Sequence, residues 1–475
     1  MAEVIFDGDG GGAEVETDVL VVGGGAAGLT AAIAAVSAGA EVVLLEREPT
    51  PSGTTAMSQG AICAAGTALQ RAEGIEDSAE RFVADIMAKT RGAADPVMAR
   101  LIAGASGPTM DWLSGELGLP YAVNPGWVGF FGHTVNRLHS LPSQTGTELS
   151  ARLQAAAAER GVEIVCNAQV VAIHATPEGR VTGATLRRPD GSGERIACRA
   201  LVAATCGFGA NREMVRRFIP GFGESPVYRS HAPSGADGSG IRWGMALGAA
   251  VGSMTAFQGY GALAEPEAIL MNYNVIMSGG VQLNARGERF CDELADISGQ
   301  ALRVLAQPGG VVWMVYDEAR HREAESLPEY RELLALGAVK QAADAAALAA
   351  RIGAEPAVVE ATLAAAVAAA EGRAPCPFGR DFRGAAPLTA PYRAVKVTGA
   401  LFHTQGGLQL DENASVVRED GTPLPNFFAA GGTARGISGE GASGYLPAAG
   451  LCSAVTLGRL AGLRAAEAAR ATAPA

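Results

Sequence analysis

The sequence predicts an α/β fold in which a parallel β-sheet meets its helices through glycine-rich turns. Residues 18–22 form a short apolar, β-branched run, which is typical of a buried parallel strand. Residues 23–28 (GGGAAG) follow with G-x-G-x-x-G spacing, and residues 29–38 continue with an alanine-rich helical pattern. Residues 41–45 then form a second apolar run. This order of strand, glycine turn, helix and strand indicates a Rossmann-like, doubly wound sheet.

The glycine turn and the acid that follows it predict a dinucleotide site. Such a turn needs positive φ and close approach of the backbone to a pyrophosphate, and the helix N-terminus offers free N–H groups to the phosphates. Glu46 ends the second strand, 18 residues past Gly28, where an acid can bind the two ribose hydroxyls. The alternative is a tight turn with a purely structural role.

Composition narrows the class of protein. The chain has 475 residues, which suits two or three domains, and a formal charge of −12. Because no cluster of Lys and Arg appears, nucleic acid is not an expected partner. The seven cysteines show no CxxC spacing, which argues against a metal site or a disulfide framework and favours a reducing compartment. The acidic N-terminus lacks signal-peptide order, and we expect a cytoplasmic protein without a membrane span.

A hydroxyl-rich segment after the second strand favours FAD over NAD. Residues 52–60 (SGTTAMSQG) offer backbone amides and hydroxyls that can hydrogen-bond the phosphates and the ring edge of a flavin. The alternative is an ordinary loop of Gly, Ser and Thr turns.

Most of the chain resembles the flavoprotein family of fumarate reductases and 3-ketosteroid dehydrogenases. Beyond the segments above, the resemblance is carried by residues 203–211 (AATCGFGAN), 235–240 (GADGSG), 403–408 (HTQGGL) and 424–433 (LPNFFAAGGT). It implies a glutathione-reductase-type FAD domain of Rossmann-like fold with an inserted α+β cap domain. Thr54 stands where some members carry a histidine bonded to FAD, so the resemblance implies noncovalent FAD.

The flavin-like sequence stops near Tyr260 and resumes near Tyr392. We therefore predict a discontinuous FAD-binding domain of residues 1–258 and 392–475, with residues 259–391 as the cap. Charged, helically spaced residues predict helices within that cap.

The segments above supply the candidate cofactor-binding residues, among which Val170 belongs to a predicted β-rich layer near the adenine. They are Gly23, Gly25, Ala26, Ala27, Gly28, Glu46, Arg47, Ser52, Gly53, Thr54, Thr55, Ser58, Gln59, Gly60, Val170, Thr205, Gly207, Asp237, Gly431, Gly432, Gly450 and Leu451.

The resemblance also shows a departure at the substrate site. Fumarate reductases use two arginines and two histidines there, but this sequence places Tyr260, Ile297 and Tyr445 at three of those positions and keeps only His403. A dicarboxylate needs fixed cationic groups, which these side chains do not supply. The departure argues against a simple fumarate or succinate enzyme.

Two tyrosines beside a flavin instead resemble the ketosteroid dehydrogenases, although Pro447 replaces a polar residue of that pattern. Forming a C=C bond next to a ketone needs a base for the α-proton, a hydride acceptor for the β-carbon and a donor to the carbonyl oxygen. We therefore take Tyr260, Tyr445 and His403 as candidate catalytic residues. The alternative for each is ordinary packing with a satisfied polar atom.

The predicted function is an FAD-dependent dehydrogenase that introduces a C=C bond α,β to the carbonyl of a cyclic or steroid-like ketone. Hydride would pass to flavin N5, a proton to a tyrosine, and electrons on to an external acceptor. An aromatic cluster with Trp127, Phe130 and His133 would line an apolar substrate pocket or anchor a buried loop.

Two alternatives remain. The first is a reductase of the C=C bond of an unsaturated carboxylic acid, with an external electron donor and with Arg137 and His139 holding the carboxylate, although a surface position is expected for Arg137. The second is an electron-transfer or assembly subunit. Because the sequence has no cysteine cluster and no CxxCH motif for iron–sulfur or haem neighbours, this second alternative is less favoured.

Overall fold

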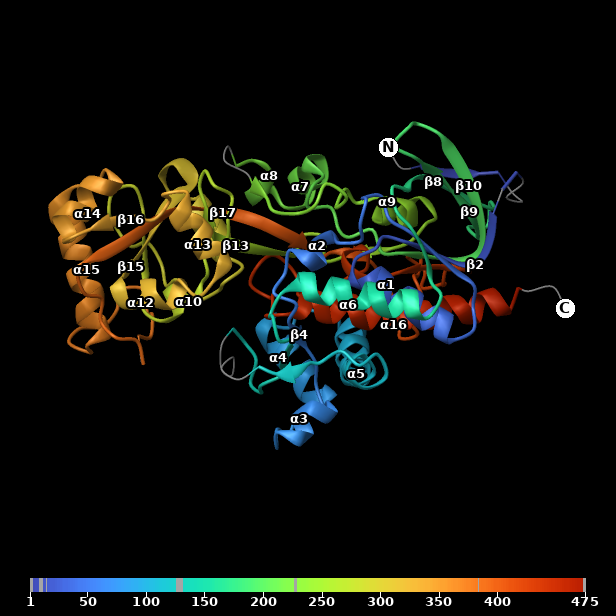
Figure 1. The fold of residues 1–475 in the computed structure, drawn as a ribbon, viewed down its shortest axis with the longest axis horizontal. Helices are drawn as coiled ribbons and strands as arrows, with labels where there is room; N and C mark the ends of the chain where they lie inside the picture. The colour runs from blue at the N-terminus through green and yellow to red at the C-terminus, as the bar shows by residue number, and fades with distance from the viewer. Residues whose placement is uncertain are drawn as a thin grey trace. The chain divides into compact units, whose positions relative to one another are not determined.

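The glycine turn joins strand and helix as the sequence predicts. Strand β2 (Val15–Val22) leads into helix α1 (Ala26–Ser37), and β3 (Val42–Leu45) returns to lie parallel to β2, with Val19 opposite Val42. All four residues of β3 are buried, as expected for a strand covered on both faces. This computed structural model confirms the predicted α/β fold (Figure 1).

The structure describes most of the chain, and its contacts divide it into two compact units. The described residues are 3–7, 12–13, 15–124, 131–225, 229–382 and 384–472. The first unit comprises Met1–Ile219, Ala232–Phe257 and His403–Ala475, and the second comprises Pro220–His231 and Gln258–Phe402.

One long strand unites the main sheet of the first unit. Strand β10 (Gly193–Ala203) pairs antiparallel with β9 (Val181–Arg187) through its first half. Its second half runs parallel to β2 on one side and to β19 (Phe427–Ala429) on the other. The strand order is β1-β8-β9-β10-β2-β3-β7, with β19 also on β10. The C-terminal flavin-like segment thereby reaches the centre of the sheet.

The outer strands of this sheet form the predicted antiparallel layer. Strand β8 (Gln169–Ala175) pairs antiparallel with β9 and parallel with β1 (Glu3–Phe6). On the opposite edge, β7 (Glu163–Val165) lies parallel to β3.

The last helix covers the sheet beside α1. Helix α16 (Ala449–Arg470) lies along α1, as Figure 1 shows. The two backbones approach closely at Gly458 and Gly462, where an added Cβ would lie 2.4 Å from Ala27 O and 2.1 Å from Ala31 O. Only glycine fits at these crossings, so the middle of α16 is held against the first half of α1.

Several shorter helices complete the first unit. They are α2 (Gly53–Ala56), α3 (Ala68–Ala72), α4 (Ala79–Lys89), α5 (Pro96–Asp111), α6 (Gly146–Glu159), α7 (Arg212–Phe218) and α9 (Ser239–Ala246).

The second unit has its own sheet. Strand β17 (Tyr392–Thr404) pairs antiparallel with β15 (Val311–Asp317), and β14 (Val281–Leu283) flanks β15. β13 (Phe257–Ala264) and β16 (Lys340–Ala342) also pair with β17. The predicted helices of this region are α12 (Glu318–Ala324), α13 (Pro328–Ala335), α14 (Ala345–Ile352) and α15 (Pro356–Ala370).

Residues 392–402, which the sequence analysis assigns to the FAD-binding part, lie in this second unit. The reason is register: Tyr392 to Thr398 pair with Asp317 to Val311 along the whole of β15. The division into an FAD-binding domain and a cap remains a prediction. No helix in the described ranges combines the length and the apolar character needed to cross a membrane.

Candidate active site

The β2–α1 turn is built so that only glycine fits. Gly23 has φ of +110°, and a Cβ there would lie 2.3 Å from Ala204 O. A Cβ on Gly28 would lie 1.8 Å from Gly23 O. These contacts pack the turn against the end of β10, and the first three residues of α1 (AAG) carry nothing larger than a methyl group, which suits a pyrophosphate.

Glu46 stabilises this turn through hydrogen bonds to its backbone. Its Oε2 accepts the Gly24 N–H at 2.7 Å, its Oε1 accepts the Glu48 N–H at 2.9 Å, and the residue is 6% exposed. A carboxylate has about four lone-pair positions, so Glu46 retains acceptor capacity for a ribose. Glu46 therefore holds the backbone of the glycine turn in place. Its contact with a ribose stays a prediction.

The hydroxyl-rich segment folds against the start of α1. Thr55, in α2, accepts the Ala26 N–H through Oγ1 at 2.9 Å. Ser58 Oγ donates to Thr55 O at 2.7 Å, and Thr54 Oγ1 lies 3.8 Å from Cys206 Sγ. Gln59 is exposed. The segment thus reaches both the phosphate-binding turn and the loop after β10.

Segments far apart in the sequence meet at this loop. A Cβ on Gly432 would lie 2.6 Å from Gly207 N, and a Cβ on Gly207 would lie 2.0 Å from Thr404 Oγ1. Gly431, with φ of +61°, faces Ala27 of α1, where a Cβ would come within 3.0 Å of the alanine methyl. Gly207, Gly431 and Gly432 therefore form one cradle with the start of α1 in the first unit.

A cavity of about 310 Å³ lies in the same unit. Residues 169–171, Arg187, Asn211, Asp237 and Arg242 line it. Two of them, Val170 and Asp237, are predicted cofactor residues. The Nε atom of Arg242 is buried and has no hydrogen-bond partner. Arg187 and Arg242 in the lining of this cavity suit an anionic dinucleotide.

Two of the candidate catalytic residues lie side by side. The rings of His403 and Tyr445 have centroids 5.7 Å apart and are inclined by 70°. Gly450, in the first turn of α16, lies between them: a Cβ there would be 3.0 Å from His403 Nε2 and 3.7 Å from Tyr445 Oη. The polar ends of both side chains therefore converge on one point.

Desolvation sets the protonation state of this pair. Burial raises the pKa of Tyr445, and the Cys63 thiol adds to the rise, while a hydrogen bond from the Gly450 backbone opposes it. Burial also lowers the pKa of His403 to about 4. At neutral pH the pair is a phenol and an uncharged imidazole, each able to donate a proton in a hydrogen bond.

Tyr260 lies in the second unit, on β13. Its hydroxyl donates to Met271 O at 2.8 Å, and its ring stacks on Phe402 with centroids 5.1 Å apart. Burial raises its pKa. Because the single hydroxyl proton is already donated to a backbone carbonyl, the geometry favours packing, and a catalytic role for Tyr260 stays a prediction.

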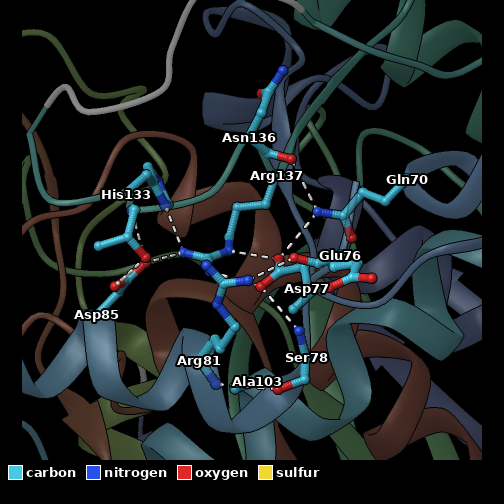
Figure 2. A network of polar contacts seen from close by, with 12 residues as sticks. Gln70, Glu76, Asp77, Ser78, Arg81, Asp85, Ala103, His133, Asn136 and Arg137 are labelled. Atoms are coloured by element: carbon cyan, nitrogen blue, oxygen red, sulfur yellow. Dashed lines mark hydrogen bonds and ion pairs between the residues drawn. The ribbon is translucent and has the colours of Figure 1, made fainter. Parts of the chain in front are cut away.

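The expectation of a surface position for Arg137 is wrong. Arg137 is fully buried and binds Asp77 through Nε at 3.0 Å and Nη2 at 2.9 Å, and Asp85 through Nη1 (Figure 2). Its cation is neutralised by two carboxylates. His139 is also buried, with its ring nitrogens bonded to Thr67 Oγ1 and Arg137 O, both at 2.9 Å. Neither side chain is available to hold a substrate carboxylate.

His133 is buried, and its place in a substrate pocket stays a prediction. It is 1% exposed, its Nε2 lies 3.0 Å from Pro447 O and its Nδ1 lies 3.3 Å from Arg137 Nη1. Since arginine only donates, Nδ1 accepts and Nε2 carries the proton to Pro447. Burial lowers the pKa of His133 to about 4. Trp127 and Phe130 fall outside the described residues.

Comparison with known proteins decides the family. A family model described as an FAD binding domain matches residues 18–455. The chain belongs to this family of flavoprotein oxidoreductases. It is 30% identical over 454 residues to a probable fumarate reductase of Shewanella frigidimarina, covering 95% of this chain and 75% of that protein. The resemblance identified from sequence is confirmed.

Two solved structures of this family share the fold. A flavocytochrome c3 fumarate reductase in an open conformation superposes with a TM-score of 0.82 and 29% identity, covering 96% of this chain and 79% of its own. A 3-ketosteroid-Δ4-(5α)-dehydrogenase from Rhodococcus jostii RHA1, solved with 4-androstene-3,17-dione, superposes with a TM-score of 0.75 and 25% identity. The match covers 96% of this chain and 98% of that one.

The cofactor and the reaction class follow. The protein binds FAD and is an FAD-dependent oxidoreductase of a family that acts on carbon–carbon single and double bonds. The glycine cradle and the arginine-lined cavity fit that cofactor. Sequence reasoning missed Gln405, which contacts His403, and Ser438, which contacts Gln405. The closeness of Gln405 to His403 in the sequence was the one available signal.

Proposed function

We propose that this flavoprotein oxidises a saturated cyclic or steroid-like ketone to the α,β-unsaturated ketone. The observation that carries the proposal is the convergence of Tyr445 and His403 on Gly450, where two uncharged donors stand in place of a carboxylate-binding arginine. The similarity to a ketosteroid dehydrogenase along nearly its whole length supports it.

Two donors at one point suit a ketone oxygen. Hydrogen bonds to the carbonyl acidify the α C–H and stabilise the enolate that develops as the proton leaves. FAD, when bound, would accept a hydride, and with it two electrons, from the β-carbon. Tyr445 and His403 are catalytic residues in this proposal. Because burial raises the pKa of the Tyr445 phenol, we assign it to donate to the carbonyl oxygen, and the α-proton would pass to a water molecule and on to solvent.

The charge state of the site argues against a dicarboxylate. A carboxylate bound beside the uncharged Tyr445 and His403 would be desolvated without a counter-cation, which is strongly unfavourable. Arg137, the cation considered for that purpose, already binds Asp77 and Asp85.

A second candidate function is the reduction of an unsaturated carboxylic acid. The 30% identity to a probable fumarate reductase favours it. It would need a cation from elsewhere in the chain to hold the acid.

Flavin bleaching under anaerobic conditions separates the two. The oxidised holoenzyme would be mixed with matched pairs of compounds on one ring, a saturated ketone and the corresponding carboxylic acid, and its visible absorbance followed. We expect bleaching by ketones, with return of colour on adding an artificial electron-accepting dye. If no saturated ketone bleaches the flavin while the dithionite-reduced enzyme is reoxidised by unsaturated acids, the second function holds instead.

A further inference from the structure

Gln405 lies next to the candidate active site with its backbone fixed on both sides. Its N–H donates to Ala256 O at 2.8 Å, and its carbonyl accepts the Gly436 N–H at 2.8 Å. The residue is 5% exposed. Its side chain therefore starts from a rigid position two residues past His403.

The side-chain amide of Gln405 bridges two parts of the site. Its Nε2 lies 2.8 Å from His403 Nδ1, and its Oε1 accepts the Ser438 hydroxyl at 3.2 Å. Ser438 is 1% exposed and belongs to the same loop as Tyr445. The Ser438 hydroxyl can donate or accept, so it anchors the far end of the amide, and the amide as it lies in the structure turns its donor end, Nε2, toward the histidine.

We propose that Ser438 and Gln405 hold His403 as the uncharged tautomer with its proton on Nε2, so that His403 presents an N–H donor beside the Tyr445 hydroxyl. The amide N–H of Gln405 must be accepted by a bare Nδ1, and this leaves the single ring proton on Nε2. Gln405 and Ser438 are positioning residues. The catalytic meaning of this arrangement rests on the proposed function, whereas the tautomer itself does not.

The geometry of the ring agrees with this assignment. The Cε1–Nε2 edge of His403 faces the first turn of α16, since a Cβ on Gly450 would lie 2.8 Å from Cε1 and 3.0 Å from Nε2. The Tyr445 hydroxyl lies at the same turn. A proton on Nε2 thus points toward the place where a substrate oxygen would meet Tyr445, and a bare Nε2 would instead offer a lone pair there.

Substitution of Gln405 by Glu reverses the arrangement. A carboxylate only accepts, so Nδ1 of His403 must carry a proton, and the ring becomes either the opposite tautomer or an imidazolium. Gln341→Glu is the matched control, because it adds the same charge at an exposed position of β16 in the second unit.

Nitrogen NMR of histidine-labelled holoenzyme measures the tautomer directly. The chain has six histidines, so His403→Gln assigns the signal by its disappearance. We expect a protonated Nε2 and a bare Nδ1 in the wild type and in Gln341→Glu, and a protonated Nδ1 in Gln405→Glu. A wild-type signal with the proton on Nδ1 overturns the proposal whatever the substrate is, even if the Glu variant fails to fold.

Kinetics test the second half of the proposal. With a ketone that bleaches the wild-type flavin, Gln405→Glu should slow flavin reduction about 10- to 100-fold at unchanged FAD content, the usual effect of losing an orienting partner. A reversed tautomer with an unchanged reduction rate would refute the catalytic role. Failure of every ketone to bleach the flavin would refute the proposed function and leave the NMR result standing.

Discussion

Removal of the Arg137 side chain should destabilise the first unit severely. Arg137→Leu would leave the Asp77 and Asp85 carboxylates, whose side chains are 0% and 6% exposed, in a buried site without their cation. Breaking a buried ion pair by deleting one partner costs about 3–5 kcal/mol, because an uncompensated charge remains. The site here has two such charges. We therefore expect a loss of unfolding free energy at or above the upper end of that range.

Urea denaturation followed by tryptophan fluorescence measures this loss. Arg464→Leu is the control, since its ion pair with Glu467 is exposed and should contribute less than about 1 kcal/mol. The sign of the pH effect follows from Asp85: burial raises its pKa, but Arg137 and Thr134 lower it below the usual 3.8. The stabilisation by Arg137 should be complete above about pH 4 and fade in stronger acid. Equal losses in Arg137→Leu and Arg464→Leu would refute the reasoning.

Three further predictions follow from the site. Acid precipitation should release all flavin into the supernatant as FAD, and a yellow pellet would show a covalent bond. Burial lowers the pKa of His133, His139 and His403 to about 4, so the unfolding free energy should fall as the pH drops from about 6.5 toward 4. Thermal denaturation at a series of pH values measures this, and a stability that does not change with pH would contradict it. Gly450→Ala should displace the His403 ring and slow flavin reduction, whereas Gly104→Ala, with nothing within 4 Å, should leave the rate unchanged.

Local patterns in the sequence are enough to predict the β2–α1–β3 unit of the fold. The β2–α1–β3 unit was predictable because apolar runs, turn glycines and helical spacing act within about 30 residues of one another. The C-terminal cradle around Gly431 was accessible only through the family resemblance. Nothing local in that segment shows that it meets Gly207, more than 200 residues upstream.

The positions of Arg137 and of residues 392–402 both depend on contacts between distant residues. Arg137 was expected at the surface because an arginine without its partners belongs there, and those partners lie 60 and 52 residues away, at Asp77 and Asp85. Residues 392–402 have a flavin-like sequence, but their pairing with β15 places them in the second unit. In each case the deciding contact is between residues distant in sequence, which a linear pattern does not reveal.

The central claim is that Tyr445 acts on the carbonyl group of a ketone substrate. Stopped-flow reduction of the flavin by a ketone that bleaches the wild-type enzyme, compared with Tyr445→Phe, tests it most directly. Deleting one hydroxyl removes a positioned donor and leaves the ring packing against His403. We predict reduction slowed by roughly 10²- to 10⁴-fold, with FAD content and unfolding midpoint near those of the wild type. An unchanged reduction rate in Tyr445→Phe would contradict the account.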